Sequence, residues 1–398
     1  MARLAILATH PIQYHVPWFQ HLARESGLAV RVFYLWDFGV TEQVDTAGFQ
    51  RAFKWDVPLL EGYEFEFVRN RSKRPGTDHF WGLNNPELLA RVARFQPDAV
   101  LLFGYNFASL MHFLWRWDRG RAPLLFRGDS HRLVPAGGAR EWLRRQAIAA
   151  VFRRFCAFLY VGRANRDYFR LHGVATDALH FAPHAVDNAR FTGAAEAARR
   201  DAKVWKRELG IAEGNRVILF AGKYEAKKRP LDLLRAFLQA GLADVSLLFV
   251  GSGPLEQELR ALAAGSEAVR FAPFQNQSLM PRAYAAADVF VLPSHGSGET
   301  WGLAVNEAMC LALPVIASSH VGCVADLVHH RRNGLVFPAG DVAALAACLG
   351  EAFADAARLR AWGEASREII AGYGYRQVTE GLLAALEHCG VATGAGAA

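Results

Sequence analysis

The chain has 398 residues, of which 52% are hydrophobic and 21% charged, and its formal net charge is +7. This length exceeds one typical domain of about 100–200 residues, and the composition excludes a disordered chain. No apolar run approaches the roughly 18–20 residues of a membrane span, and the first one, LAILA, is too short for a secretory signal. We therefore expect the protein to stay in the cytosol.

The positive charge lies in the first half of the chain. Residues 1–190 hold 25 Lys+Arg and 17 Asp+Glu, whereas residues 191–398 hold 20 and 21. This asymmetry favours contact of the first half with something anionic, such as a membrane surface, a phosphate-bearing substrate or nucleic acid, although solubility alone would also explain it. The five cysteines form no CxxC pair, which argues against a structural zinc site.

Short apolar runs alternate with amphipathic stretches along the whole chain. Runs typical of buried strands are LAILATH, VRVFYL, AVLLFGY, PLLFRGD and AFLYVG in the first half, and VILFAGK, VSLLFVG, AVRFAPF, VFVLPS, PVIAS and GLVFPAG in the second. Such alternation favours parallel sheets with helices on both faces. The sequence therefore predicts an α/β protein with two doubly wound, Rossmann-like domains that face a central cleft.

The boundaries follow from the two series of strands. We place the first domain at residues 1–190, a polar, Ala/Arg-rich linker at 191–213, the second domain at 214–375, and a C-terminal helix with a flexible tail at 376–398. In proteins built on such sheets, ligands bind at the carboxyl ends of the strands.

Residues 141–155, EWLRRQAIAAVFRRF, combine apolar and arginine side chains at helical spacing. A basic amphipathic helix can lie on an anionic membrane surface. The alternative is a helix that packs on the core and exposes a solvated basic side.

A basic loop follows the first strand of the second domain. The strand ends at Gly222, the loop carries Lys223 and Lys228, and a helix begins near Pro230. Cations ahead of a helix N-terminus suit a diphosphate, but a solvated loop would look the same. Gly251 closes the next strand in a GxG pattern that lacks a third glycine, which is weak evidence for a nucleotide.

The stretch SGETWGLAVNEAMCLALPVIASS, residues 297–319, places two carboxylates in apolar surroundings. We predict a helix from Trp301 to about Leu311, with Glu299 in the preceding loop and Glu307 inside the helix. The first backbone N–H groups of that helix would point at an anion. Carboxylates only accept hydrogen bonds and suit sugar hydroxyls, although Glu307 could also be an ordinary surface residue.

The pattern ExxGLxxxEAMxxxxPVIAS resembles the Glu-x7-Glu signature of the family-four retaining glycosyltransferases, which have the glycosyltransferase B fold. The segments FAPHAVDNARF, FAGKYEAKKRPLDLLRAF and VADLVHHRRNGLVFPAGD resemble further motifs of that family in the same order, so the likeness is strong over residues 180–345. The first of them resembles the segment usually written I-P-N-G-V-D. In the first domain, THPIQYHVPWFQHLA stands where the family has a glycine-rich loop.

The resemblance implies roles for individual residues. Glu299 would contact the donor sugar, Glu307 the ribose diol, and Lys228 and Lys223 the diphosphate. In the first domain, the strand PLLF leads to Asp129 and His131, either of which could face the cleft and take part in catalysis. The other residues expected to bind the donor are Trp301, Gly302, Leu303, Gly222, Gly251 and Phe274.

The resemblance also implies the substrates. The donor would be a nucleotide-diphosphate sugar, with a UDP-sugar favoured and a GDP-sugar second, and the first domain would bind a glycan or lipid-linked glycan acceptor. The sequence has no Asp-x-Asp motif, so we expect neither a metal nor another cofactor. No motif supports nucleic-acid binding. If the helix at 141–155 contacts a membrane, the protein would be peripheral on its inner face and would act in cell-envelope or exopolysaccharide synthesis.

Other classes of protein compete with this interpretation. A sugar-nucleotide epimerase could share the architecture, whereas a phosphorylase would need a pyridoxal lysine and usually a longer chain. A nicotinamide-dependent dehydrogenase would need the third glycine. A nucleotide-binding module without activity is the non-enzymatic alternative, and the intact Glu299, Glu307 and Lys228 argue against it.

Overall fold

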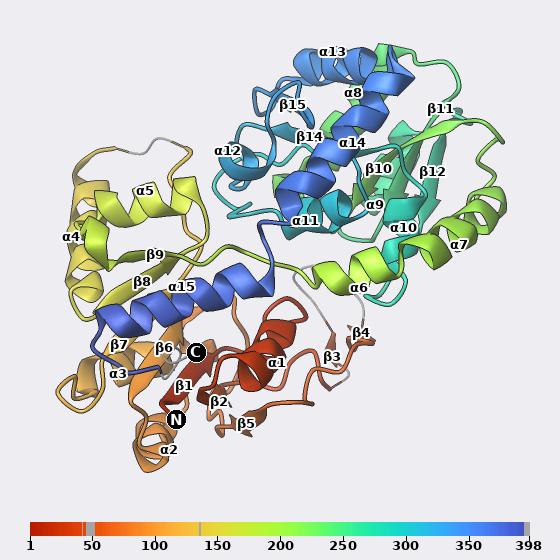
Figure 1. The fold of residues 1–398 in the computed structure, drawn as a ribbon. Coiled ribbons are helices and arrows are strands. Elements are labelled where there is room, and N and C mark those ends of the chain that lie inside the picture. The colour runs from red at the N-terminus through yellow and green to blue at the C-terminus, as the bar shows by residue number, and fades with distance from the viewer. Residues whose placement is uncertain (42, 45–51, 135–136, 394–398) are drawn as a thin grey trace.

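The computed structural model describes residues 1–41, 43–44, 52–134 and 137–393. Within these residues, the first half of the chain forms a seven-stranded parallel sheet, in the order β5-β2-β1-β6-β7-β8-β9 (Figure 1). Its strands are β1 (Arg3–Ala8), β2 (Ala29–Tyr34), β5 (Glu64–Phe67), β6 (Ala99–Phe103), β7 (Leu124–Arg127), β8 (Ala157–Tyr160) and β9 (Leu179–Phe181). A short antiparallel pair, β3 (Gln43–Val44) and β4 (Ala52–Phe53), lies outside this sheet.

The second half forms another parallel sheet, which has six strands among the described residues, in the order β12-β11-β10-β13-β14-β15. These strands are β10 (Arg216–Ala221), β11 (Val245–Val250), β12 (Val269–Ala272), β13 (Val289–Leu292), β14 (Val315–Ser318) and β15 (Gly334–Phe337). In both sheets the order changes direction at the first strand of the domain, as in a doubly wound fold. The predicted fold class is confirmed.

The apolar runs become strands because both faces of each sheet are covered. Along β1, Leu4 and Ile6 belong to one hydrophobic cluster, and Ala5 and Leu7 belong to another on the opposite face. Successive side chains of a strand point to opposite faces, so a run without polar residues is stable only between two layers of helices. Strand β10 divides its side chains between two clusters in the same way.

Helices connect the strands and cover both faces of the sheets (Figure 1). Those of the first half are α1 (Val16–Glu25), α2 (Leu88–Phe95), α3 (Ala108–Arg116), α4 (Ala139–Phe152) and α5 (Arg163–Leu171), with the 3-10 turns η1 (Phe80–Gly82) and η2 (Thr176–Ala178). The others are α6 (Asn188–Gly193), α7 (Ala195–Glu208), η3 (Ala226–Lys228), α8 (Pro230–Ala240), α9 (Glu256–Leu262), α10 (Met280–Ala285), α11 (Leu303–Cys310), α12 (Val324–Leu327), α13 (Val342–Phe353), α14 (Ala356–Ile370) and α15 (Tyr375–His388). No helix in the described residues is long and apolar enough to cross a bilayer.

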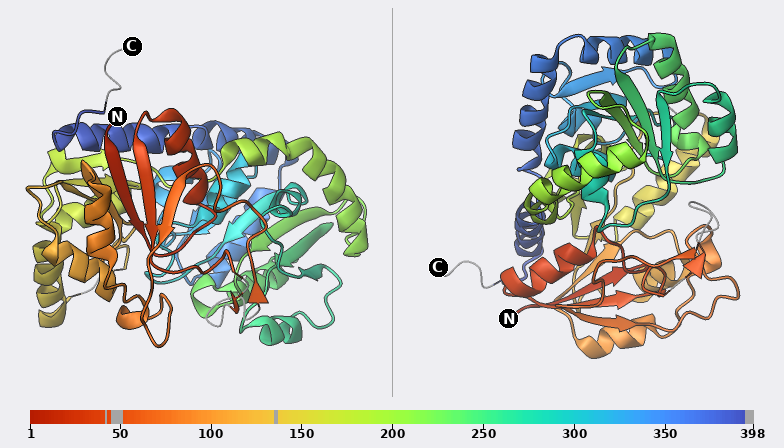
Figure 2. Two further views of the ribbon diagram at one scale, coloured as in Figure 1. Left: turned by 90° about the horizontal axis from the view of Figure 1, so that it is seen from below. Right: turned by 90° about the vertical axis from the view of Figure 1, so that its right-hand side faces the viewer.

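The two ends of the second domain are helical. The segment that we expected as a linker forms α6 and α7, and Trp205 of α7 is buried in the core of the second domain. Helix α15 returns to the first sheet, where Trp18 of α1 donates a hydrogen bond from its Nε1 to Thr379 Oγ1 at 3.2 Å. Figure 2 shows this blue helix beside the red helix α1. The last five residues of the expected tail lie outside the described residues.

Candidate active site

A cavity of about 480 Å³ lies between the two domains, at the carboxyl ends of strands from both sheets. Its walls include residues that the sequence placed far apart in the chain. The predicted site residues that line it are Asp129, Gly222, Lys223, Lys228, Gly251, Phe274, Glu299, Trp301, Gly302, Leu303 and Glu307. The fold therefore brings together all the predicted donor-binding residues.

The helix that carries Glu307 begins at Leu303, two residues later than predicted. Gly302 precedes it with a φ of +99°, and a Cβ there would lie 2.9 Å from Val321 Cγ1. Only glycine adopts this conformation readily and leaves room for the neighbouring side chain. The backbone must therefore turn at Gly302 before the helix can start, which gives α11 an N-terminus that faces the cavity.

Lys228 and Glu299 form a buried ion pair on the wall of the cavity. Lys228 Nζ lies 2.5 Å from Glu299 Oε2, and the hydroxyl of Ser294 donates to the same oxygen at 3.0 Å. Their side chains are 16% and 10% exposed. Lys228 ends the 3-10 turn η3, and Arg229 then adopts a left-handed φ of +53° before α8 begins at Pro230. This tight turn directs the ammonium group into the cleft.

Glu307 is buried in α11 and carries an unsatisfied acceptor. The hydroxyl of Tyr284 donates to Glu307 Oε2 at 2.6 Å, whereas Oε1 has no hydrogen-bond partner within the described residues. Burial raises the pKa of the Glu307 carboxyl above its usual value, and contacts with Tyr284, Arg190 and Tyr14 oppose this rise. A buried carboxylate oxygen without a donor is costly, so this atom is prepared to accept a hydrogen bond from a ligand.

Asp129 reaches from the first domain to the second. Its Oδ2 accepts a hydrogen bond from the hydroxyl of Thr300 at 2.7 Å and lies 3.4 Å from Nε2 of His184. Burial alone would raise the pKa of Asp129, but the contacts with His184 and Thr300 hold it well below its usual value. Burial lowers the pKa of His184 despite the nearby carboxylate. Asp129 is therefore ionised and His184 neutral near pH 7.

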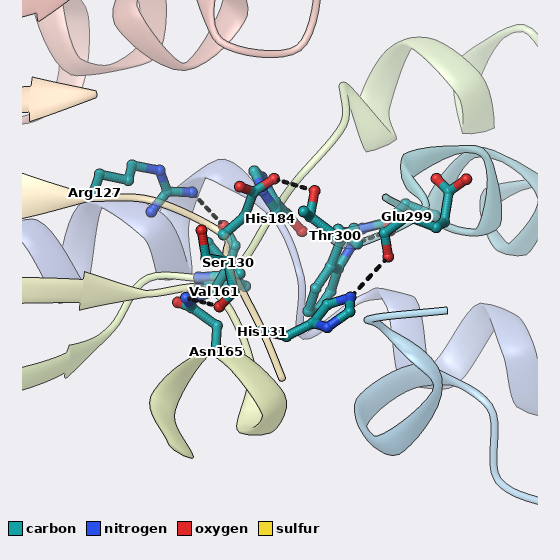
Figure 3. A network of polar contacts seen from close by, with 12 residues as sticks. Arg127, Ser130, His131, Val161, Asn165, His184, Glu299 and Thr300 are labelled. Atoms are coloured by element: carbon teal, nitrogen blue, oxygen red, sulfur yellow. Dashed lines mark hydrogen bonds and ion pairs between the residues drawn. The ribbon is translucent and has the colours of Figure 1, made fainter. Parts of the chain in front are cut away.

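His131, the other candidate of the first domain, is not among the residues that line the cavity. Its Nε2 donates to the backbone oxygen of Glu299 at 3.2 Å (Figure 3). Its Nδ1 accepts from the backbone N–H of Leu133 at 3.3 Å. Asn165 of α5 supports this loop by donating to the Ser130 carbonyl at 2.8 Å. In this arrangement His131 positions the loop that carries Glu299, and Asp129 is the residue that reaches the cavity.

Further contacts across the domain interface hold the cavity closed on one side. Both carboxylate oxygens of Asp326 accept from the first backbone N–H of α5, that of Arg163, at 3.0 and 3.1 Å. Asn306 of α11 accepts from Trp301 Nε1 at 2.8 Å and donates to the carbonyl of His184 at 3.0 Å. The second domain thus supplies the cap of a helix in the first domain.

Replacing Gly162 with alanine should destabilise this interface. A Cβ there would lie 2.4 Å from Trp301 Cζ3 and 2.7 Å from Asp326 Oδ2, so the domains would have to separate slightly. We expect a loss of about 1–3 kcal/mol of stability, as for other overpacked sites. Thermal unfolding of Gly162→Ala would measure it. Gly193→Ala is the control, because a Cβ at Gly193 meets nothing within 4 Å, and an equal loss in both variants would contradict the expectation.

Three residues of the site were not predicted from the sequence. His184 lies in FAPHAVDNARF, where it occupies the position of the asparagine in the family's I-P-N-G-V-D segment, and this departure was the available signal. Tyr14 and Tyr284 flank Glu307, and burial raises the pKa of each hydroxyl, so both remain protonated. No sequence pattern links these tyrosines to Glu307, because Tyr14 comes from the first domain and Tyr284 from a different helix of the second.

The cavity offers cations and backbone N–H groups to a ligand. Lys223 and Lys228 lie after β10, and the N-terminus of α11 lies beside them on the same cavity wall. Such a set suits the oxygens of a diphosphate. Within the described residues, no group of three or more His, Cys, Asp or Glu side chains is arranged to hold a metal ion.

Two facing Rossmann-like domains with a ligand cavity between them define the glycosyltransferase B class. Solved structures share the fold over nearly the whole chain. HepE from Anabaena, determined in complex with UDP and glucose, is 18% identical, with a TM-score of 0.72 over 97% of this chain and all of that one. WaaG, a glycosyltransferase involved in lipopolysaccharide biosynthesis, is 17% identical, with a TM-score of 0.66 over 96% of this chain and 99% of that one.

The sequence comparisons give the family. The model of "Glycosyl transferases group 1" matches residues 201–369. A D-inositol 3-phosphate glycosyltransferase from Nocardia farcinica is 30% identical over 362 residues, which cover 82% of this chain and 76% of that protein. The sulfoquinovosyl transferase SQD2 of Arabidopsis thaliana is 27% identical over 313 residues, 74% of this chain and 57% of that protein. The chain belongs to the group 1 glycosyltransferases, and the predicted family resemblance is confirmed.

Proposed function

We propose that this glycosyltransferase moves a sugar, with retention of its anomeric configuration, from a nucleotide-diphosphate sugar to a hydroxyl of a glycan or lipid-linked glycan. The observation that carries the proposal is the pairing of two features in one cavity. The Lys228–Glu299 ion pair lies on its wall, and Glu307 presents an unpartnered carboxylate oxygen to the same space. Cations suit the diphosphate, and carboxylate acceptors suit the hydroxyls of ribose and donor sugar.

The proposed mechanism depends on charge that develops during the reaction. As the bond from the anomeric carbon to the diphosphate breaks, negative charge grows on the diphosphate. Lys228, Lys223 and the N-terminus of α11 would stabilise this charge more strongly in the transition state than in the ground state. The acceptor hydroxyl would attack on the same face and lose its proton to the departing diphosphate. In this proposal the lysines take the place of a bridging metal ion.

A nucleotide screen tests the donor. We expect UDP to raise the thermal unfolding temperature of the protein more than GDP, ADP, dTDP or NAD, with GDP second, and we expect the shift to persist in the presence of EDTA. The UDP preference is supported by the resemblance of the fold to HepE, whose structure contains UDP. A shift with NAD alone would contradict the proposal, and a shift that EDTA abolishes would contradict metal independence. NMR of the product would give the anomeric configuration.

We propose a peripheral contact with an anionic membrane through the first turns of α4, which would place the enzyme in cell-envelope or exopolysaccharide synthesis. In α4, Ile148, Val151 and Phe152 are buried in the core of the first domain. Trp142 and Leu143 remain 60% and 61% exposed, beside exposed arginines. A helix end with exposed apolar and basic side chains can bind an anionic lipid surface.

Vesicle co-sedimentation tests this contact. The protein should bind vesicles that contain an anionic lipid more strongly than vesicles of neutral lipid alone, and salt should weaken the binding because it screens the arginines. The double variant Trp142→Ser, Leu143→Ser should lose most of the binding, whereas Trp81→Ser, which removes a 64% exposed tryptophan on η1, should retain it. Equal binding by both variants would exclude α4 as the contact.

A further inference from the structure

A second cavity, of about 200 Å³, lies at the carboxyl ends of three strands of the first sheet. It is lined by the end of β1 and the start of the next loop, by Phe103 at the end of β6 and Gly104 after it, and by Arg127 at the end of β7 and Gly128 after it. The loop from Thr9 to His15 forms one of its sides, and this is the segment that replaces the family's glycine-rich loop. The departure in sequence therefore has a structural consequence, because the loop builds a cavity wall with side chains.

The two cavities share a wall. Ile12, Asp129 and His184 line both of them. Glu299 and Lys228 line the larger cavity only, whereas His15 and Thr9 line the smaller one only. A group bound in each cavity would thus meet at Asp129 and His184, which is the arrangement that transfer between two substrates requires.

We propose that the second cavity binds the terminal unit of the acceptor, a single uncharged polyol ring, and holds its reacting hydroxyl at Asp129 and His184. This inference rests on the proposed function, because it needs a donor sugar in the larger cavity.

The charges of the cavity favour a neutral ligand. Arg127 and Asp129 are its charged residues, and their charges cancel. Two nitrogens of the Arg127 guanidinium donate to the carbonyls of Ala182 and Pro183 at 2.7 and 3.0 Å, whereas its buried Nε has no hydrogen-bond partner within the described residues. Burial lowers the pKa of both His15 and His184, which leaves them neutral. A phosphate or carboxylate would lie beside the Asp129 carboxylate and would leave the cavity with a net negative charge.

The remaining polar groups suit hydroxyls. Nε2 of His184 is buried and has no hydrogen-bond partner within the described residues, the His15 imidazole lines the same cavity, and Thr9 adds a hydroxyl that lies 3.1 Å from Nδ1 of His10. A neutral imidazole both donates and accepts, as a sugar hydroxyl does. Ile12 and Phe103 add an apolar surface on which the C–H face of a sugar ring can lie. The cavity therefore offers polar partners for the hydroxyl groups of a polyol ring and an apolar surface for its C–H face.

The volume limits the ligand to about one ring. The larger cavity, at about 480 Å³, is proposed to hold a base, a ribose, a diphosphate and a sugar. On that scale the second cavity, at about 200 Å³, has room for one ring with its substituents and not for a chain of several. The rest of a longer acceptor would lie outside it.

The transfer step balances without a further reactant. The acceptor oxygen forms a bond to the anomeric carbon, and the bond from that carbon to the diphosphate oxygen breaks, with its electron pair going to the diphosphate. The acceptor proton passes to the diphosphate. Asp129, ionised in this site, accepts a hydrogen bond from the acceptor hydroxyl and orients it, and the Thr300 hydroxyl, which donates to Asp129 Oδ2 at 2.7 Å, fixes the position of the carboxylate.

The first test is selectivity among acceptors, with release of nucleoside diphosphate as the measurement. The protein is given UDP-glucose, or GDP-mannose if GDP is the nucleotide that binds. The acceptor probes are neutral monosaccharides, methyl glycosides and cyclitols, compared with glucose 6-phosphate and glucuronate. At least one neutral ring should increase release about tenfold more than either anion. If the anions work equally well, or if no neutral ring works although the nucleotide binds, the inference is wrong and the proposed function stands.

The second test is a pair of variants on α1 and its preceding loop. His15→Phe keeps a ring of similar size but removes both nitrogens, so the KM for the acceptor should rise about tenfold, the effect of one lost hydrogen bond. The Kd for the nucleoside diphosphate should stay unchanged. His21→Phe, a half-buried histidine of α1 that lines neither cavity, is the matched control and should change neither constant.

An unchanged acceptor KM in His15→Phe would overturn the inference. If this variant does not fold, Thr9→Val removes a hydroxyl from the same cavity and should raise the same KM. A wild-type protein that binds no nucleoside diphosphate would instead refute the proposed function, and the acceptor inference with it.

Discussion

Replacing Lys228 with methionine should lower kcat by roughly 10²–10³-fold, the range seen when an enzyme loses one group that stabilises developing charge. Lys228 Nζ contacts Glu299 Oε2 at 2.5 Å and lines the wall where we place the diphosphate. Its charge would be most useful when the diphosphate departs, so the loss should fall mainly on kcat. Steady-state kinetics with the preferred nucleotide sugar would measure it, and Lys203→Met, an exposed lysine of α7, is the control.

The same substitution should also destabilise the folded protein. It leaves the Glu299 carboxylate buried without its cation, and breaking a buried pair in this way costs about 3–5 kcal/mol. The double variant Lys228→Met, Glu299→Gln removes both charges and should recover most of that stability while activity stays low. If the double variant recovers activity as well, Lys228 serves only to neutralise Glu299, and its proposed role at the diphosphate is wrong.

The parts of the molecule that could be predicted from the sequence are those encoded in short, continuous segments. Apolar runs such as VILFAGK predict buried strands because a strand covered on both faces needs no polar residue. The spacing of Glu299 and Glu307 places one in a loop and the other in the helix that follows it. Their positions near one ligand can therefore be predicted without information on distant residues. The same holds for Lys228, which follows its strand by a few residues. These are local consequences of chain geometry.

The parts that could not be predicted depend on pairs of residues from different domains. His184 acquires a role because Asp129 lies 3.4 Å from it, and Asp129 is fixed in turn by Thr300 of the second domain. The start of α11 was placed two residues too early because Val321, which excludes a Cβ at Gly302, is distant in sequence. Likewise, nothing in the pattern of α15 indicates that it packs on the first sheet, since an amphipathic helix does not specify its partner.

Changing Glu307 to glutamine should weaken the binding of nucleoside diphosphate by about 10–100-fold without weakening the fold. The Oε1 atom of Glu307 is buried and has no donor within the described residues, so a ligand hydroxyl can supply the missing hydrogen bond. Hydrogen bonds to charged groups contribute about 1.5–3 kcal/mol, and 1.4 kcal/mol corresponds to tenfold in affinity. The glutamine retains one oxygen for Tyr284 but replaces the other with an amide nitrogen that only donates.

Isothermal titration of the Glu307→Gln variant with UDP and GDP would measure the loss of affinity, and Glu258→Gln, on the exposed side of α9, is the control.

The pH dependence of stability separates this role from a structural one. Burial raises the pKa of Glu307, so the folded chain binds this proton more readily than the unfolded chain does. Stability should therefore increase as the pH falls through the raised pKa towards the ordinary value of 4.5, and this group should contribute no further change below that value. Glu307→Gln has no such proton, so the difference in unfolding free energy between the variant and the wild type should favour the variant at neutral pH and shrink on acidification. A variant that is less stable at neutral pH and binds nucleotide normally would show that the carboxylate is held for the fold and not for the ribose.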